Sequence, residues 1–418
     1  MKDSRPRASE AKRFIWPIIA AQVLVQIGAF TLPALLPTYI EGWQLTKTDA
    51  GWMIGIFFAA YVAAVPLLVS LTDRIPVRQV YAVGAGLTAV SHFGFACLAD
   101  GFWSGFIFRA IAGIGWAGAY MPGLKAIADT LQGDAQSRGV SMHAAGVGVA
   151  GASSFAVAGL IDGLYGPAAA FYFGGTAALL AMSIAWSTMP KERPAQLVPT
   201  KTKSLLDFRP VFRNRRAMAW IAGYTVHTWE LAALRAWAVT FLTVTAERTG
   251  SSTWMSVPTF LFTAAGLIGI IVSVSGNEAA QRFGRSRIAT VAMIGAAVLS
   301  LCTGWLVGVS LLLAVVLVMM WNAVIYLDSS ALTAGTVQSA DPSLRGATMG
   351  LHSMFGYAGG FIGPLGVGWL LDAAGNETVV GWGLGFGHLA IVTFAGLWIM
   401  RRLGSDREKL AELLPKGG

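Results

Sequence analysis

Charged residues are scarce in this sequence, and cysteines are scarcer still. Only 12% of its 418 residues are charged, whereas a soluble globular protein carries about 25%. The two cysteines, Cys97 and Cys302, both lie in apolar runs. They therefore form neither a disulfide framework nor a metal-binding knuckle. The low charge excludes an ordinary soluble domain, and the cysteines predict no metal site.

Motifs of nucleotide-driven and hydrolytic proteins are missing as well. The chain has no phosphate-binding loop of the Gly-x-x-x-x-Gly-Lys-Ser/Thr type, no His-Glu-x-x-His pair and no Gly-x-Ser-x-Gly elbow. Its five histidines are scattered without metal-ligand spacing. We therefore predict neither an ATP-driven pump nor a membrane enzyme, and we expect no catalytic residue and no cofactor.

Apolar residues are abundant instead. Hydrophobic residues make up 55% of the chain, which has 50 glycines, 15 tryptophans and a mean hydropathy of +0.61. A membrane helix needs about 20 mostly apolar residues, and twelve runs meet this requirement. They cover residues 14–40, 50–71, 77–99, 102–128, 138–163, 166–189, 217–245, 252–276, 286–306, 308–335, 345–372 and 378–401. The sequence predicts an all-α membrane protein with twelve transmembrane helices.

The first run follows the basic pair Lys12-Arg13, as the apolar stretch of a signal peptide does. It is too long for such a stretch and lacks the small residues of a cleavage site. We therefore predict that it is retained as one transmembrane helix.

One connection is longer and more polar than the others. It covers residues 190–216, contains prolines and is strongly basic. It separates the twelve runs into two groups of six. We expect an N-terminal six-helix bundle over residues 1–189, a cytoplasmic linker over 190–216, and a C-terminal bundle with a cytoplasmic tail over 217–418.

The basic residues are distributed unevenly between the two sides. With the N-terminus in the cytoplasm, that side holds 25 of the 30 lysines and arginines. The opposite loops hold Lys47 and Arg248, and three more lie inside predicted helices. This positive-inside bias predicts that both termini are cytoplasmic. The net charge of +9 reflects this orientation and attraction to anionic lipid, so it predicts no nucleic-acid partner.

The two halves repeat one another. The segment DAQSRG (134–139) follows the fourth run, and DPSLRG (341–346) follows the tenth, 207 positions later. Basic segments after the second and eighth runs match at an offset of 208. A parallel repeat of six helices predicts a transporter whose site lies between the halves.

The segment after the second run, VSLTDRIPVR (69–78), resembles the signature Gly-x-Leu-Ala-Asp-Arg-x-Gly-Arg-Arg of the major facilitator superfamily. It retains Asp73, Arg74 and Arg78 but replaces both glycines. The second copy, residues 277–286, retains Arg282, Gly284 and Arg285 and has Gln281 in place of the acid. With the twelve helices, the linker and the repeat, the chain is identified as a member of this family. The resemblance implies the major facilitator fold, two pseudo-repeated six-helix bundles.

The resemblance also implies a latch at the cytoplasmic gate. In the family, the acid of this loop faces the N-terminus of a neighbouring helix, where a carboxylate gains about 0.3–1 kcal/mol, and the arginines pair across the gate. The alternative is that these basic residues only fix the topology. The residues predicted for the gate are Asp73, Arg74, Arg78, Lys125, Arg138, Arg282, Arg285 and Arg345.

The fifth run resembles the exporter signature of the family poorly. That signature has Gly-Pro followed by Gly-Gly, whereas residues 146–151 contain glycines and no proline. A Gly-Pro pair occurs in the eleventh run instead, at Gly363-Pro364. This difference weighs against an antiporter without excluding one.

Five ionisable side chains lie inside predicted helices, on the fourth, seventh and tenth runs. They are Arg109, Lys125, Glu230, Arg235 and Asp328. A charge inside a membrane costs about 2.5–3.5 kcal/mol, so such residues are functional candidates by default. In the family, helices one, four, seven and ten line the central cavity. The resemblance thus places all five beside the pathway between the halves.

Glu230 lies about 20 Å into the seventh run, near the midplane. His227 and Trp237 share its face of the helix, whereas Arg235 lies about 140° away, so we expect no direct Glu230–Arg235 pair. The repeat places Gln22 of the first run at the equivalent position. A neutral amide in one half and an acid in the other suggest that Glu230 carries the coupling proton. The alternative is a structural ion paired with another helix.

Arg109 is the first choice for holding a substrate anion or the coupling acid, because its planar fork binds carboxylates bidentately. A permanent salt bridge within the bundle is the alternative. Lys125, near the cytoplasmic surface, can snorkel, pair with Asp129 at i+4, or meet Asp328 across the cavity as a gate. The residues predicted for substrate binding or proton coupling are Arg109, Glu230, His227, Arg235, Gln22, Gln26, Asn322, Tyr326, Asp328, Trp116 and Tyr120.

Together these features predict a secondary active transporter that works by alternating access. Three buried bases against two acids favour a small organic anion taken up with protons. The alternative is a proton-coupled multidrug or metabolite efflux antiporter, in which Glu230 or Asp328 binds the cation. We expect a small-molecule substrate, protons as the coupling ion, and a monomer that crosses the bacterial inner membrane many times. A channel would not need coupled titratable groups.

Overall fold

The structure is a computed structural model that describes residues 8–192, 208–251 and 256–404. These residues form fifteen α-helices and one short 3-10 helix, and none of them forms a strand. In chain order the elements are α1 (Ala8–Gln26), α2 (Thr31–Ala34), α3 (Leu36–Gly42), α4 (Lys47–Leu71), α5 (Val77–Leu98), α6 (Phe102–Thr130), α7 (Gly133–Tyr165), α8 (Pro167–Thr188), α9 (Arg209–Arg213), α10 (Arg215–Arg248), α11 (Ser256–Phe283), α12 (Arg285–Gly304), α13 (Leu311–Ser339), η1 (Pro342–Leu344), α14 (Arg345–Ala373) and α15 (Val379–Gly404).

Eleven of the twelve predicted runs coincide with one long helix each. The largest boundary difference is at α11, which ends at Phe283 and not at residue 276. Nine helices of the described residues are long and apolar enough to cross a membrane. The other three predicted spans are α1, which is interrupted, and α6 and α10, which carry charges within the membrane.

Several helices begin with side chains that bind free backbone N–H groups. The Thr46 hydroxyl accepts from the N–H of Asp49, and the Asp49 carboxylate accepts from the N–H of Thr46, which forms a capping box at the start of α4. Asn214 and Ser310 accept in the same way at the starts of α10 and α13. These polar residues end the loops and fix where each span begins.

The first predicted helix is not continuous. The run 14–40 forms α1, then a turn over residues 27–30, and then the short helices α2 and α3. The prediction of a single helix was therefore wrong, because a run of 27 apolar residues can be long enough to span and still break. A broken backbone inside a membrane needs partners for its free polar groups.

Three neighbouring helices supply those partners. His92 of α5 bonds the carbonyl oxygen of Gly28 at 3.1 Å through Nε2. Arg109 of α6 donates from Nη1 to the carbonyl oxygen of Ala29 at 3.3 Å. The backbone N–H of Phe30 donates to the hydroxyl of Ser154 on α7 at 3.0 Å. The break is thus fixed by the bundle around it.

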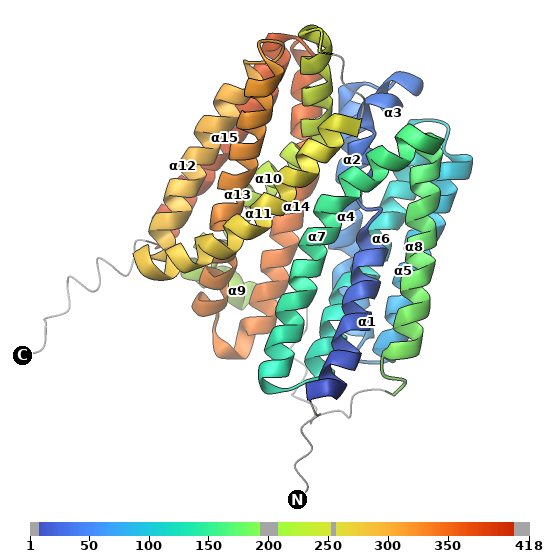
Figure 1. Cartoon of the computed structure of the whole chain (residues 1–418). Coiled ribbons are helices and arrows are strands. Elements are labelled where there is room, and N and C mark those ends of the chain that lie inside the picture. Colours follow the sequence, from blue (N-terminus) through green and yellow to red (C-terminus); the bar gives the residue numbers. More distant parts are fainter. Residues whose placement is uncertain (1–7, 193–207, 252–255, 405–418) are drawn as a thin grey trace, which may run out of the picture.

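The helices form two bundles (Figure 1). We call α1 to α8 the first half and α10 to α15 the second half. Four helix pairs provide most of the contact between the halves, namely α4 with α14, α7 with α11, and α2 and α3 with α10. α6 and α13, the other two central helices, do not pack together in the described part of the chain. The boundaries of the linker remain a prediction, since residues 193–207 lie outside the described residues.

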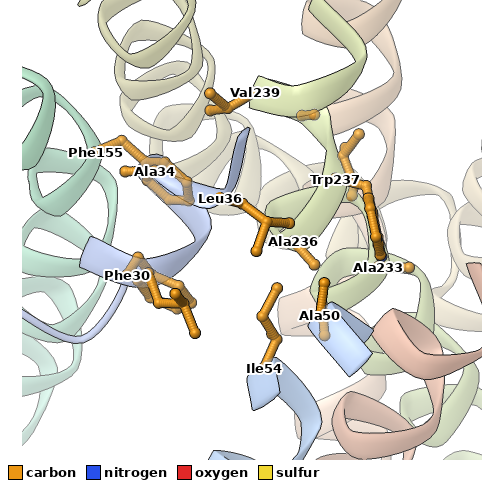
Figure 2. Packing of buried hydrophobic residues seen from close by; sticks show 14 of the residues in the cluster. Phe30, Ala34, Leu36, Ala50, Ile54, Phe155, Ala233, Ala236, Trp237 and Val239 are labelled. Atoms are coloured by element: carbon orange, nitrogen blue, oxygen red, sulfur yellow. The ribbon is translucent and has the colours of Figure 1, made fainter. Parts of the chain in front are cut away.

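Glycines bring α4 and α14 into close contact. A Cβ atom on Gly51 would lie 2.9 Å from the carbonyl oxygen of Pro364, and one on Gly55 would lie 2.7 Å from that of Phe361. Small residues of this kind allow membrane helices to approach backbone to backbone. Figure 2 shows Leu36 of α3 near Ile54 of α4 and Ala236 of α10, so the broken first helix fills the adjoining space.

The contact is strongest at the end where α4 begins and α14 ends, which we call the outer end. The carboxylate of Asp372 accepts from the N–H of Lys47 at 3.0 Å, from the N–H of Thr48 at 2.8 Å and from the Thr48 hydroxyl at 2.6 Å. The ammonium group of Lys47 pairs with Glu377 at 2.6 Å. A residue of the second half therefore caps a helix of the first. A nearby cavity lined by Thr38, Asp162 and Thr243 measures only about 10 Å³, and the bonds of Asp372 and Lys47 join the halves beside it.

Candidate functional site

Arg235 lies between the two halves. Its guanidinium carbon is 5.1 Å from the centre of the Phe30 ring in the broken first helix, and it donates to the hydroxyl of Tyr326 on α13. The side chain is half-buried. No carboxylate of the described residues lies within ion-pair distance of it. Arg235 thus offers a free positive charge to the space where the halves meet.

The Glu230 side chain points away from that space. Its Oε1 accepts from the indole N–H of Trp321 on α13 at 2.6 Å, and its Oε2 accepts from the hydroxyl of Thr393 on α15 at 3.4 Å. It is 3% exposed. The resemblance placed Glu230 beside the pathway between the halves, whereas its carboxylate binds residues of α13 and α15 in its own half. As expected, Glu230 does not pair with Arg235.

His227 and Asp328 form a buried pair in the same half. Nδ1 of His227 lies 2.8 Å from Oδ1 of Asp328, and both side chains are almost fully buried. The Tyr224 ring stacks with His227 at 5.7 Å and with His352 at 3.8 Å between ring centres. His352 in turn contacts the hydroxyl of Thr336. Titratable groups from α10, α13 and α14 are thereby joined in one column.

Four other predicted site residues have partners inside one half. Gln22 donates to Gln26 along α1 at 3.0 Å, and Asn322 donates to the carbonyl oxygen of Ala265 on α11 at 2.7 Å. Arg109 is 2% exposed and binds the broken first helix. Its guanidinium also lies 4.7 Å from the centre of the Phe57 ring. Neither Arg109 nor Asn322 is exposed to the space between the halves.

Lys125 does not form the predicted pair with Asp328. Its ammonium group lies 2.8 Å from Asp129, one turn later on α6, and 3.4 Å from Asp73 in the loop between α4 and α5. Both acids belong to the first half, whereas Asp328 is occupied by His227. Of the three interpretations of Lys125, the structure thus shows the i+4 pair and excludes the cross-cavity gate in this state.

The other gate residues show contacts only within one half. Arg78 lies over the ring of Trp186 at 4.5 Å. Arg138 donates to a carbonyl of its own helix, and Arg285 donates to Gln338. Arg74, Arg282 and Arg345 lie at the same end of the molecule, at or beside helix boundaries. The latch across the cytoplasmic gate remains a prediction, and it concerns a state in which that end is closed.

Two features of the site escaped the sequence analysis. Tyr357 of α14 brings an aromatic ring of the second half against those of Tyr61 and Trp116, and Asp372 joins the halves at the outer end. The sequence features that could have indicated them are the tyrosines within the apolar runs and the acid at the end of the eleventh run. Among the described residues, no group of three or more histidines, cysteines or acids could hold a metal ion.

Two packed helical bundles with buried charges near their contact define a membrane transporter of the two-bundle class. A sequence profile of the Major Facilitator Superfamily matches residues 18–364. The chain belongs to this family, as its sequence predicted. No curated protein sequence matches the chain.

Solved structures of transporters share its fold. A variant of the nucleoside transporter NupG superposes with a TM-score of 0.75 at 14% identity, covering 93% of this chain and 99% of that one. A bacterial homologue of the human lysosomal transporter Spinster, inward-facing and unoccupied, gives a TM-score of 0.73 at 14% identity, with coverages of 94% and 95%. At this identity the likeness shows the fold alone.

Proposed function

We propose that this protein is a secondary active transporter that takes up a small organic anion together with protons. The observation that carries the proposal is Arg235, a guanidinium between the halves with no acid of the described residues beside it. A charge in a membrane protein is costly unless it is paired. An anionic substrate supplies the missing partner, and a guanidinium binds a carboxylate through two parallel hydrogen bonds.

Proton coupling is supported by the groups that share α10 with Arg235. His227, Glu230 and Arg235 lie within nine residues of one helix. The buried carboxyl of Glu230 has only neutral donors at hydrogen-bond distance, and the His227–Asp328 pair lies nearby. Gain or loss of a proton at either place changes a buried charge, so it can shift α10 and, with it, the position of Arg235.

The efflux alternative is less well supported. A cationic substrate needs an acid that faces the space between the halves. Glu230 points toward α13 and α15, and Asp328 is bound to His227. The free charge that does face this space is positive, so it repels a cation.

Flux into proteoliposomes tests the proposal. Thermal-shift screening of the purified chain against organic anions and cationic drugs first identifies binders. An inwardly directed proton gradient should then drive accumulation of a bound anion. Proton-driven expulsion of cations, with no uptake of any anion, would contradict the proposal.

The Glu230→Gln variant tests the proton site. The amide oxygen of glutamine can still accept from Trp321, so the packing should survive while the titrating group is lost. We expect gradient-driven accumulation to disappear and exchange of labelled for unlabelled anion to continue. Glu278→Gln, at an exposed carboxyl of α11, is the matched control and should accumulate anion normally. If Glu230→Gln accumulates anion as fast as wild type, the coupling proton is elsewhere, and Asp328→Asn is the next variant.

A further inference from the structure

Aromatic rings from both halves meet near the middle of the molecule. Tyr61 of α4 and Trp116 and Tyr120 of α6 come from the first half, and Tyr357 of α14 comes from the second. We call these four residues the central aromatic cluster. The Tyr357 ring centre lies 4.5 Å from that of Tyr61 and 5.2 Å from that of Trp116. The cluster therefore crosses the contact that alternating access must open and close.

The rings of the first half are arranged as a stack. Phe57 lies 5.2 Å from Trp116 with an angle of 24° between the ring planes, and Trp116 lies 5.9 Å from Tyr120 with an angle of 20°. Tyr357 meets Trp116 edge to face, at 86°. Aromatic rings prefer to pack either as offset stacks or edge to face. The Trp116 ring makes contacts of both kinds. A planar group that enters between the halves can insert between Tyr357 and this stack.

Polar atoms in the cluster are available to a ligand. The indole N–H of Trp116 has no hydrogen-bond partner among the described residues, although the side chain is only 6% exposed. A buried donor without a partner costs about 1–3 kcal/mol, so such groups usually have a role. The Tyr120 and Tyr357 rings are half-buried, which leaves part of each accessible.

The charge beside the cluster is positive. Arg235 is near enough to Tyr224 and Tyr357 to interact with both electrostatically. Cages of tyrosine and tryptophan also bind quaternary ammonium groups, but such sites gain from a nearby acid. Here the acids of α10 and α13 have other partners, and the free charge is a guanidinium.

From this arrangement we infer that the substrate is an anion that carries a planar aromatic or heteroaromatic ring. The ring stacks between Trp116 of the first half and Tyr357 of the second, and the acidic group binds Arg235. The inference rests on the proposed function, because it assumes transport of an anion between these halves. It assigns Trp116 and Tyr357 to specificity and Arg235 to charge recognition.

Matched pairs of ligands test the inference on the full chain in lipid nanodiscs. Each pair has the same carboxylate with a flat or a saturated ring: benzoate with cyclohexanecarboxylate, phenylacetate with cyclohexylacetate, and naphthoate with decalincarboxylate. Benzyltrimethylammonium serves as the cationic aromatic probe. Binding is measured by calorimetry and by the shift in melting temperature. We expect at least one flat carboxylate to bind about fivefold to tenfold more tightly than its saturated mate.

Substitutions at Tyr357 locate the preference. Tyr357→Phe keeps the ring and should keep the preference for flat carboxylates, whereas Tyr357→Leu should lose most of it. Phe171→Leu removes an equally flat ring from a stack with Phe95 inside the first half, so it should leave the preference unchanged. The wild-type comparison stands even if the leucine variant fails to fold.

The outcomes separate this inference from the proposed function. Equal binding of flat and saturated carboxylates would overturn the inference and leave anion transport standing. If benzyltrimethylammonium binds and no carboxylate does, both the inference and the proposed anion transport are overturned. Failure of all the carboxylates to bind would also overturn the inference, while proton-driven uptake of another anion would still support the function.

Discussion

Arg109 and Arg235 both lie within helices of the bundles and have no acidic partner among the described residues, yet their surroundings differ. Arg109 binds the backbone of the broken first helix and lies against Phe57 inside the first half. Within the described part of the chain, Arg235 donates one hydrogen bond, to the Tyr326 hydroxyl, and its guanidinium reaches Phe30 at the contact between the halves. We therefore assign Arg109 to holding the fold and Arg235 to binding the substrate, which reverses the order that the sequence suggested.

Lysine substitutions distinguish these two roles. Arg235→Lys keeps the charge but loses the planar fork, so binding of an anionic ligand should weaken about tenfold or more while the melting temperature stays close to wild type. Arg109→Lys should instead lower the melting temperature and leave the affinity of the folded fraction nearly intact. Calorimetry and thermal unfolding of the two purified variants provide the comparison. If Arg109→Lys loses affinity without losing stability, Arg109 belongs to the binding site after all.

At this scale the sequence located the charges but not their partners. Its five intramembrane ions all lie on helices near the contact between the halves, and Lys125 has the i+4 partner that its spacing allowed. The partners of Glu230 are Trp321 and Thr393, from α13 and α15. Helical periodicity fixes the faces of a single helix, whereas the rotation of that helix against five others depends on packing.

At the scale of elements, the sequence predicted the spans well because length and apolarity decide whether a helix can cross a membrane. The break in the first helix could not be predicted in the same way. Its free carbonyls are bound by His92 and Arg109, and its free N–H by Ser154. These residues lie 64 to 124 positions away along the chain, so no local pattern reports their contact.

Ser154→Ala tests whether these partners stabilise the break. The substitution leaves the buried N–H of Phe30 without an acceptor, which should cost about 1–3 kcal/mol of stability. Ser141→Ala is a matched control on the same helix, because that hydroxyl is exposed and binds only the carbonyl of Ser137. Thermal unfolding in detergent should show a clear loss for the first variant and almost none for the second. Equal melting temperatures would mean that the break persists without Ser154.

At the scale of the whole molecule, the structure represents one state of the transport cycle. The halves are joined at the outer end by Asp372 and the Lys47–Glu377 pair, while the predicted gate residues at the opposite end show contacts only within their own halves. The charge bias predicts that both termini are cytoplasmic, and with that orientation we expect this arrangement to correspond to an inward-facing state. Sequence repeats indicated two bundles, but they carried no information about which state is populated.

Asp372→Asn tests whether the outer contact sets the balance between states. The carboxylate binds three donors at the start of α4, and the neutral amide cannot replace all three bonds or their attraction to the helix N-terminus. Because these contacts exist only while the outer end is closed, their loss should favour the outward-open state by about 1 kcal/mol or more, roughly fivefold in population.

Asp49→Asn is the control, since Asp49 caps the same helix from within the first half. With Cys97 and Cys302 replaced by serine, a cysteine introduced by Thr243→Cys in the outer cavity should react faster with a polar thiol reagent in Asp372→Asn than in Asp49→Asn or the parent. Equal rates in all three would show that Asp372 stabilises α4 without influencing which end of the transporter is open.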